Sequence, residues 1–285
     1  MRATQLFAAC WLEATAPKLG NVHPAAPFDD LTYNDFLRAA RAAVPVLAQA
    51  ESLGVGRTLL EAVRATRAAC STNVNLGIVL LLAPLAAVPA EVPLRDGVGR
   101  VLEALTVEDA VLAYEAIRLA QPGGLGQAPD QDVAQPPTKT LLEAMRLAAG
   151  RDAVAAEYAS GFAQVFDCLR PRMARARGDF PEHWSDWIVR WQIELLAERP
   201  DTLIARKCGA AAAAEASARA RALLDASPPG RALEPDAAAA LDDWLRADGH
   251  RRNPGSTADL LAAGLFAAFR ERVLDLPPAV PVCET

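Results

Sequence analysis

Apolar residues recur along this chain at helical spacing, and no long apolar/polar alternation typical of strands appears. In one such stretch, a single face of the expected helix carries Phe36, Leu37, Ala40, Val44 and Leu47. Thr32 and Asp35 precede it with the spacing of a capping box, which marks a helix start. Thr106 and Asp109 repeat that signature before a second helix. The pattern therefore predicts helices with defined beginnings.

The same spacing continues from near the first residue to residue 273. The expected helices cover 3–15, 32–47, 57–70, 76–88, 106–120, 138–148, 152–175, 182–198, 202–225, 235–247 and 257–273. No repeat of fixed period occurs, which argues against a solenoid. We therefore expect an all-α protein in which residues 1–285 form a single compact multi-helix domain.

Two stretches interrupt this pattern as loops. Residues 121–137 are rich in Pro, Gly, Gln and Asp, and a connection of that length inside a compact domain is usually functional or disordered. Residues 226–235 are typical of a surface linker. The most apolar stretch, 76–88, has only 13 residues and contains Pro84. Because about 20 apolar residues are needed to cross a bilayer, it is expected to be a core helix.

Composition narrows the class of protein. Of 285 residues, 52% are hydrophobic, which suffices for one large core or two small ones. The net charge of −6 argues against nucleic acid as the main partner, although a nucleotide needs only a local basic patch. Five scattered cysteines have no CxxC spacing, and the first residues do not resemble a signal peptide. We expect a soluble cytoplasmic protein with free thiols and no membrane contact.

The first of four polar, glycine-containing segments is PKLGNVHP, residues 17–24. Gly20 permits a tight turn and close approach of the backbone to a ligand, with Lys18 and Asn21 beside it. The alternative is a glycine that ends a helix with proline beyond it. His23 is a candidate acid or base, and a histidine of a surface turn is the alternative.

The second segment, residues 71–77, leads into the most apolar helix. Asn73, Asn75 and Gly77 lie where backbone N–H groups point outward, an arrangement that suits an anion or a nucleotide. Simple capping of the helix is the alternative.

The third segment, PDTLIARK, begins with Asp201, which could cap a helix that starts near Thr202. Capping does not explain Arg206, for which a surface ion pair with Asp201 is the alternative to ligand binding.

The fourth segment, residues 251–259, runs from a basic pair through a Pro-Gly turn into a helix. Arg252, Asn253, Gly255 and Ser256 could form a phosphate cradle. Asp259 could cap this helix, ligate a metal or do both. None of the four segments is a P-loop and no strand precedes any of them, which excludes a Rossmann site.

Taken together, PKLGNVH, STNVNLG, PDTLIARK and NPGSTADLL resemble, in order and character, the motifs of the triphosphoribosyl-dephospho-CoA synthase family. The resemblance extends from residue 13 to 269, and Glu13 and the glycine-rich stretch at 122–126 also fit it. Two departures stand out. Leu19 replaces the second proline of the first motif, and Asn75-Leu76 replaces the His-Lys of the enzymes associated with citrate lyase. The NVNLG form is closer to the archaeal-type branch.

The resemblance implies an ATP-using transferase in which a hydroxyl of dephospho-CoA attacks C1 of the ribose of ATP and adenine leaves. Such a centre gains oxocarbenium character and favours a nearby carboxylate. The resemblance then assigns Asp201 and Asp259 to Mg²⁺ or to the sugar cation. It assigns phosphates to Lys18, Arg206 and Arg252, and ribose or base to Asn21, His23, Asn73 and Asn75. Gly20, Gly77, Thr202, Asn253, Gly255 and Ser256 complete the expected nucleotide site.

Two other functions stay open. One is a related enzyme that makes another cofactor, such as a one-carbon carrier of the methanopterin or methanofuran type. The other is a non-enzymatic helical interaction module, which the Asp, Asn and Arg residues of the four segments disfavour. The expected partners are ATP and a small-molecule acceptor, with dephospho-CoA as the first candidate, and a homo-oligomer is compatible with the sequence.

Overall fold

The computed structural model describes residues 1–70, 72, 74–123, 126 and 128–281. Within these residues the regular secondary structure consists of helices joined by loops. In chain order the helices are α1 (Arg2–Thr15), α2 (Tyr33–Leu47), α3 (Ala50–Leu53), α4 (Val55–Ala69), α5 (Leu76–Ala87), α6 (Leu94–Glu103), α7 (Val107–Ala120), α8 (Leu141–Ala148), α9 (Ala153–Ser160), the π-helix η1 (Gln164–Leu169), α10 (Arg170–Ala176), α11 (Phe180–Glu198), α12 (Thr202–Cys208), α13 (Ala210–Ala226), α14 (Pro235–Arg246) and α15 (Gly255–Arg270). Over the described residues no strand forms, and a single bridge pairs His23 with Ala26. The expected all-α fold is confirmed.

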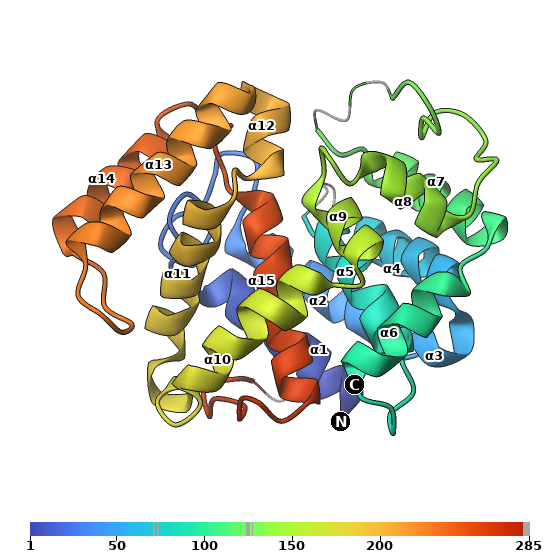
Figure 1. Ribbon diagram of the computed structural model, residues 1–285, viewed down its shortest axis with the longest axis horizontal. Coiled ribbons are helices and arrows are strands. Elements are labelled where there is room, and N and C mark those ends of the chain that lie inside the picture. The colour runs from blue at the N-terminus through green and yellow to red at the C-terminus, as the bar shows by residue number, and fades with distance from the viewer. Residues whose placement is uncertain (71, 73, 124–125, 127, 282–285) are drawn as a thin grey trace.

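The helices are arranged around α15, which lies in the middle of the molecule (Figure 1). Helices α1 and α5 pack directly against α15, and α2, α4 and α7 to α9 continue on the α5 side. Helices α11 to α14 lie on the other side. Nearly every residue of α5 and α15 is buried, as expected for helices that are apolar on all faces. The two helices thus form a fixed frame to which the polar segments are attached.

The hydrophobic residues divide into a large and a small cluster. The large one is built by α1, α2, α4, α5, α7 and α15 together with their neighbours. The small one joins α11 to α14, with Ile193 and Leu245 fully buried in it. Of the residues described, no helix is long and apolar enough to cross a membrane. The expectation that 76–88 is a core helix is therefore confirmed, because α5 is short and buried.

The structure corrects two of the expected helices. The range 152–175 is divided because Gly161 and Phe162 have left-handed backbone angles, φ 67° and 64°, after which the chain continues as η1 and α10. The range 202–225 is divided at Gly209, where φ is 90°. Helices α3 and α6 were not expected from the pattern. The second division matters for the site, because it leaves α12 as a short separate helix.

Candidate functional site

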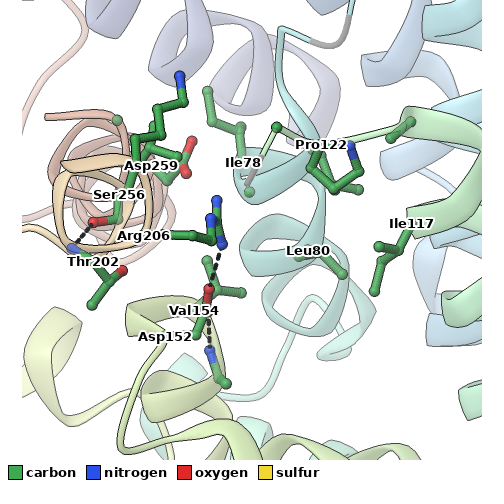
Figure 2. A pocket seen from close by; sticks show the side chains of 18 of the residues that line it. Ile78, Leu80, Ile117, Pro122, Asp152, Val154, Thr202, Arg206, Ser256 and Asp259 are labelled. Atoms are coloured by element: carbon green, nitrogen blue, oxygen red, sulfur yellow. Dashed lines mark hydrogen bonds and ion pairs between the residues drawn. The ribbon is translucent and has the colours of Figure 1, made fainter. Parts of the chain in front are cut away.

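A deep cleft of about 1130 Å³ opens between the first turns of α5, α12 and α15 on one side and helices α7 to α9 on the other. Figure 2 shows Thr202, Arg206 and Asp259 on one wall, and Ile117 and Pro122 on the opposite wall. All four polar segments of the sequence contribute lining residues to this cleft. The loop after α7 also contributes to the lining with Gln131 and Asp132. Convergence of segments so distant in the chain identifies the cleft as the candidate functional site.

Asp201 fixes the geometry of one wall but does not line the cleft. Its Oδ1 accepts hydrogen bonds from the backbone N–H groups of Leu203 and Ile204, at 2.9 and 3.0 Å, and so caps α12. Its Oδ2 accepts from both N and Oγ1 of Thr257, each at 2.8 Å. The side chain is 2% exposed. With both oxygens engaged inside the protein, Asp201 joins the starts of α12 and α15.

Thr202 and Ser256 extend that junction toward the cleft, which both of them line. The backbone N–H of Thr202 donates to Ser256 Oγ at 3.0 Å, and Thr202 Oγ1 accepts from the N–H of Ala153 at 3.1 Å. Helix α15 begins at Gly255, with Pro254 at its cap position. The alternative in which Asp259 caps this helix is therefore wrong, since Pro254 occupies the cap position and no side chain of the described residues caps α15.

Asp259 reaches the cleft from the second turn of α15 (Figure 2). Among the described residues no hydrogen bond or ion pair engages its carboxyl group. Burial raises the pKa of Asp259 well above its usual range, and the carboxylates of Glu13, Asp201 and Asp152 add to that rise, against the effect of Arg206. A carboxyl group in this position is poised to meet a positive charge.

Gly77 is required where α5 passes Asp259. A Cβ atom at this position would lie only 2.0 Å from Asp259 Oδ2. The absence of a side chain therefore lets the carboxyl group lie against the first turn of α5. Asn75, which precedes the helix, is its cap residue and is 7% exposed, and it does not line the cleft. Asn73 lies outside the described residues.

Lys18 is fully buried and does not line the cleft. Its Nζ lies 2.9 Å from Glu13 Oε1 and also donates to the backbone oxygen of Glu13. Glu13 is 3% exposed and lines the cleft from α1. Lys18, which the sequence suggested as a phosphate ligand, is therefore paired with Glu13. In the sequence, Glu13 stood out only as a residue that fits the family motifs.

The other residues of the first segment divide between the cleft and the core. Asn21 lines the cleft together with Asn253, to whose Oδ1 its amide donates at 2.5 Å. Gly20 has φ 73° and its N–H donates to Asp242, so it forms a structural turn. His23 does not line the cleft, and burial followed by the nearby Arg246 lowers its pKa. An imidazole of lowered pKa is neutral at physiological pH.

The cations of the cleft differ from those expected. Arg206 lines it and forms an ion pair with Asp152 at 3.3 Å, across to the start of α9 (Figure 2). The alternative considered for Arg206, an ion pair with Asp201, does not form, because Arg206 pairs with Asp152 instead. Lys207, which follows it on α12, also lines the cleft, and burial and the neighbouring Arg206 lower its pKa. Arg252 lies outside the lining, with its guanidinium 4.3 Å from the ring centroid of Trp244.

The site residues that sequence reasoning missed are Glu13 as a lining group, Asp152 and Lys207. Lys207 stood in the quoted PDTLIARK segment and could have been included from that position. Asp152 stands at the start of the expected helix 152–175, where an aspartate usually acts as a helix cap. It does cap α9, because its Oδ1 accepts a hydrogen bond from the N–H of Ala155 at 3.0 Å. Over the described part of the chain, no three His, Cys, Asp or Glu side chains are grouped to hold a metal ion by themselves.

Comparison with known proteins adds to this geometry. A family model described as CitG, ATP:dephospho-CoA triphosphoribosyl transferase, matches residues 2–276. A solved structure from Archaeoglobus fulgidus, provisionally assigned as a triphosphoribosyl-dephospho-CoA synthase, is similar with 25% identity and a TM-score of 0.65. The similarity covers 82% of this chain and 98% of that one. No curated protein matches this chain.

Proposed function

Because the chain belongs to the CitG family of ATP:dephospho-CoA triphosphoribosyl transferases, we propose that its cleft transfers the triphosphoribosyl group of ATP to a hydroxyl of dephospho-CoA. The observation that carries this assignment to the cleft is the position of Asp259, a carboxyl group without a partner among the described residues, on the same wall as Arg206. This arrangement offers one group to a developing positive charge and another to phosphates. We also propose that the chain acts as one domain.

In this reaction an oxygen of the acceptor hydroxyl forms a bond to C1 of the ribose. The bond from C1 to the adenine nitrogen breaks, the hydroxyl proton is released, and adenine takes up a proton. Positive charge develops on the ribose as adenine departs, and the carboxylate of Asp259 is the group placed to stabilise it. Removal of one preorganised electrostatic contact of this kind commonly costs about 10²- to 10³-fold in rate.

Arg206 and Lys207 would bind the triphosphate. Both line the cleft from the last turn of α12, and guanidinium and ammonium groups are the donors that phosphates prefer. The low pKa of Lys207 reflects burial beside another cation, a situation that a bound phosphate would relieve. Asn21 and Asn253 line the same cleft and would position the ribose or base through their amides. Arg206 is favoured over Lys18 and Arg252 for phosphate, because Arg206 lines the cleft and the other two residues do not.

Mg²⁺ is the expected companion of ATP, and the donors present fit it. Asp259 supplies carboxylate oxygen at the cleft, and Glu13 adds a buried carboxylate oxygen that has no hydrogen-bond partner within the described residues. Mg²⁺ usually takes only one or two protein carboxylates and completes its shell with water and phosphate. When bound, it would offset the charge of the triphosphate. Asp201 is less suited than expected, because four donors already saturate its oxygens.

The acceptor distinguishes this proposal from its alternative. Leu76 lines the cleft at the position where the enzymes associated with citrate lyase carry the Lys of their His-Lys pair. This departure supports the archaeal-type branch, as does the similarity to the structure from Archaeoglobus fulgidus. An acceptor of the methanopterin or methanofuran type would fit a site that lacks that cation.

Two measurements test the proposal. ATP with Mg²⁺ should raise the melting temperature, because a ligand bound only by the native state stabilises it by about 2.7 kcal/mol at 100 times Kd. Adenine release from ATP should then be followed with dephospho-CoA and with one-carbon carriers in separate reactions. Release that depends on dephospho-CoA supports the proposal, and release only with another acceptor supports the alternative. No stabilisation by any nucleoside triphosphate would argue for an interaction module.

A further inference from the structure

The buried carboxylate of Glu13 is only half satisfied. Its Oε1 is paired with Lys18 at 2.9 Å, but its Oε2 has no hydrogen-bond partner within the described residues. Glu13 is only 3% exposed, so this oxygen lies in the protein interior at the edge of the cleft. An ionised oxygen left without a partner in the interior is costly, and native proteins seldom keep one without a reason.

A second glutamate of the same chain shows the ordinary solution. Glu157 is equally buried, at 2% exposure, and each of its oxygens accepts a backbone N–H at 3.1 Å, from Gln164 and Val165. Glu13 and Glu157 are therefore equally buried but differ in hydrogen bonding. Among the described residues, Glu13 Oε2 lacks the partner that each oxygen of Glu157 has.

The place of Glu13 indicates what that partner is. Glu13 lines the candidate cleft from α1, and Asp259 lines it from α15, the helix against which α1 packs. The Asp259 carboxyl also has no hydrogen bond among the described residues. Glu13 and Asp259 thus line one cleft, and each has a carboxyl oxygen without a hydrogen-bond partner among the described residues. Such oxygens favour a positive charge, and a hard cation such as Mg²⁺ prefers oxygen ligands.

We infer that Glu13 and Asp259 together bind the divalent cation that accompanies ATP, with Lys18 holding Glu13 in place from the interior. This inference rests on the proposed function, because the substrate phosphates would complete the coordination. It replaces the pair expected from the sequence, Asp201 and Asp259, with a pair drawn from α1 and α15. Lys18 is a positioning residue here, since it touches Glu13 and not the cleft.

The pair agrees with the chemistry of Mg²⁺ better than with that of zinc. Mg²⁺ is held by few carboxylates and keeps several waters, whereas a zinc site needs three or four protein ligands. The described residues contain no group of three His, Cys, Asp or Glu side chains suited to a metal. A site made of two carboxylates and completed by substrate oxygens contains fewer than three such side chains, so it is compatible with the absence of a larger group.

The test uses Mn²⁺ alone as the probe and follows free Mn²⁺ by electron paramagnetic resonance as full-length protein is added. Glu13→Gln and Asp259→Asn should each weaken Mn²⁺ binding at least tenfold. The matched control, Glu157→Gln, removes another buried carboxylate away from the cleft and should change binding less than twofold. Mn²⁺ should raise the melting temperature of the parent protein and of the control, but not of the two cleft variants.

Parental Mn²⁺ affinity in Glu13→Gln, or no Mn²⁺ binding by the parent protein, would overturn the inference. If Glu13→Gln does not fold, Asp259→Asn alone decides, because that side chain has no hydrogen bond to lose among the described residues. ATP binding without metal is measured separately in the presence of a chelator. A parent protein that binds ATP while Glu13→Gln keeps its Mn²⁺ site would reject the inference and leave the proposed function standing.

Discussion

Asp201 and Thr257, which are 56 residues apart in the chain, join the starts of α12 and α15. Asp201 Oδ2 accepts from both the backbone N and the Oγ1 of Thr257, while Oδ1 caps α12. Because Arg206 follows on α12 and Asp259 on α15, this single carboxylate sets the spacing of the cation and the acid along one wall of the cleft. Its effect on function is through position.

Replacing Asp201 should therefore damage stability first. Asp201→Ala removes a helix cap, worth about 1 kcal/mol, and leaves buried donors of Thr257 unpaired, at about 1–3 kcal/mol more. Denaturant unfolding should show the midpoint falling accordingly. Asp201→Asn keeps an acceptor oxygen and should lose less. Equal stability of Asp201→Ala and the parent protein would contradict the structural role.

The close approach of α5 to Asp259 gives a second prediction. Gly77→Ala would place a Cβ atom 2.0 Å from Asp259 Oδ2, so the carboxyl group must move and activity should fall at least tenfold. Gly99→Ala is the matched control, since a Cβ atom there meets nothing within 4 Å and α6 gains from alanine. Steady-state rates of both variants check this. Similar rates would mean that the position of Asp259 does not matter.

Lys207 provides a test of the phosphate end. Lys207→Met keeps an apolar stem but removes the charge, and the Michaelis constant for ATP should rise about tenfold or more because a charge-assisted hydrogen bond is lost. The turnover number should change much less, since the reacting carbon is elsewhere. Lys139→Met makes the same change outside the cleft lining and should leave both constants unchanged. An unchanged Michaelis constant in Lys207→Met would remove this residue from the triphosphate site.

Much of this arrangement could be predicted from the sequence, because helix starts carry local signals. The capping boxes expected at Thr32 and Thr106 are both present. Three of the four polar segments lie at helix entrances, before α5, α12 and α15, and the first follows the end of α1. Their order and character, which resemble those of one family, are what indicated a common site.

Partner choice was not predictable, because it depends on packing between distant elements. Lys18 and Arg252 had the character of phosphate ligands, yet one is paired with Glu13 and the other stacks on Trp244. In the sequence, Asp201 and Asp259 both lie near expected helix starts. Only the packing of α12 against α15 makes Asp201 a buried link between the two helices and leaves Asp259 lining the cleft. Glu13 sits inside an apolar helical run, where a single charge has no distinguishing local pattern.

Glu157 should make the stability of the protein depend on pH. Burial raises its pKa from 4.5 to about 7, against the hydrogen bonds from Val165 and Gln164 that lower it. Since the folded pKa exceeds the unfolded one, the contribution of this group is fully present below about pH 4.5 and is lost as pH rises through about 7. The loss is up to about 3 kcal/mol.

Glu157→Gln removes this titration, so the difference in unfolding free energy between the variant and the parent should shift in favour of the variant from pH 4.5 to pH 8. Urea unfolding of both proteins at the two pH values measures that difference. A difference that stays constant would mean that the pKa of Glu157 is not raised.

The central claim is that the carboxyl group of Asp259 serves the departure of adenine from ATP in this cleft. The most direct measurement is the rate of adenine release from ATP, with dephospho-CoA and alternative acceptors, by the parent protein and by Asp259→Asn. The account predicts that the variant melts close to the parent temperature, because the carboxyl group forms no hydrogen bond among the described residues, but loses about 10²- to 10³-fold in rate. A variant that melts normally and releases adenine at the parental rate would contradict it.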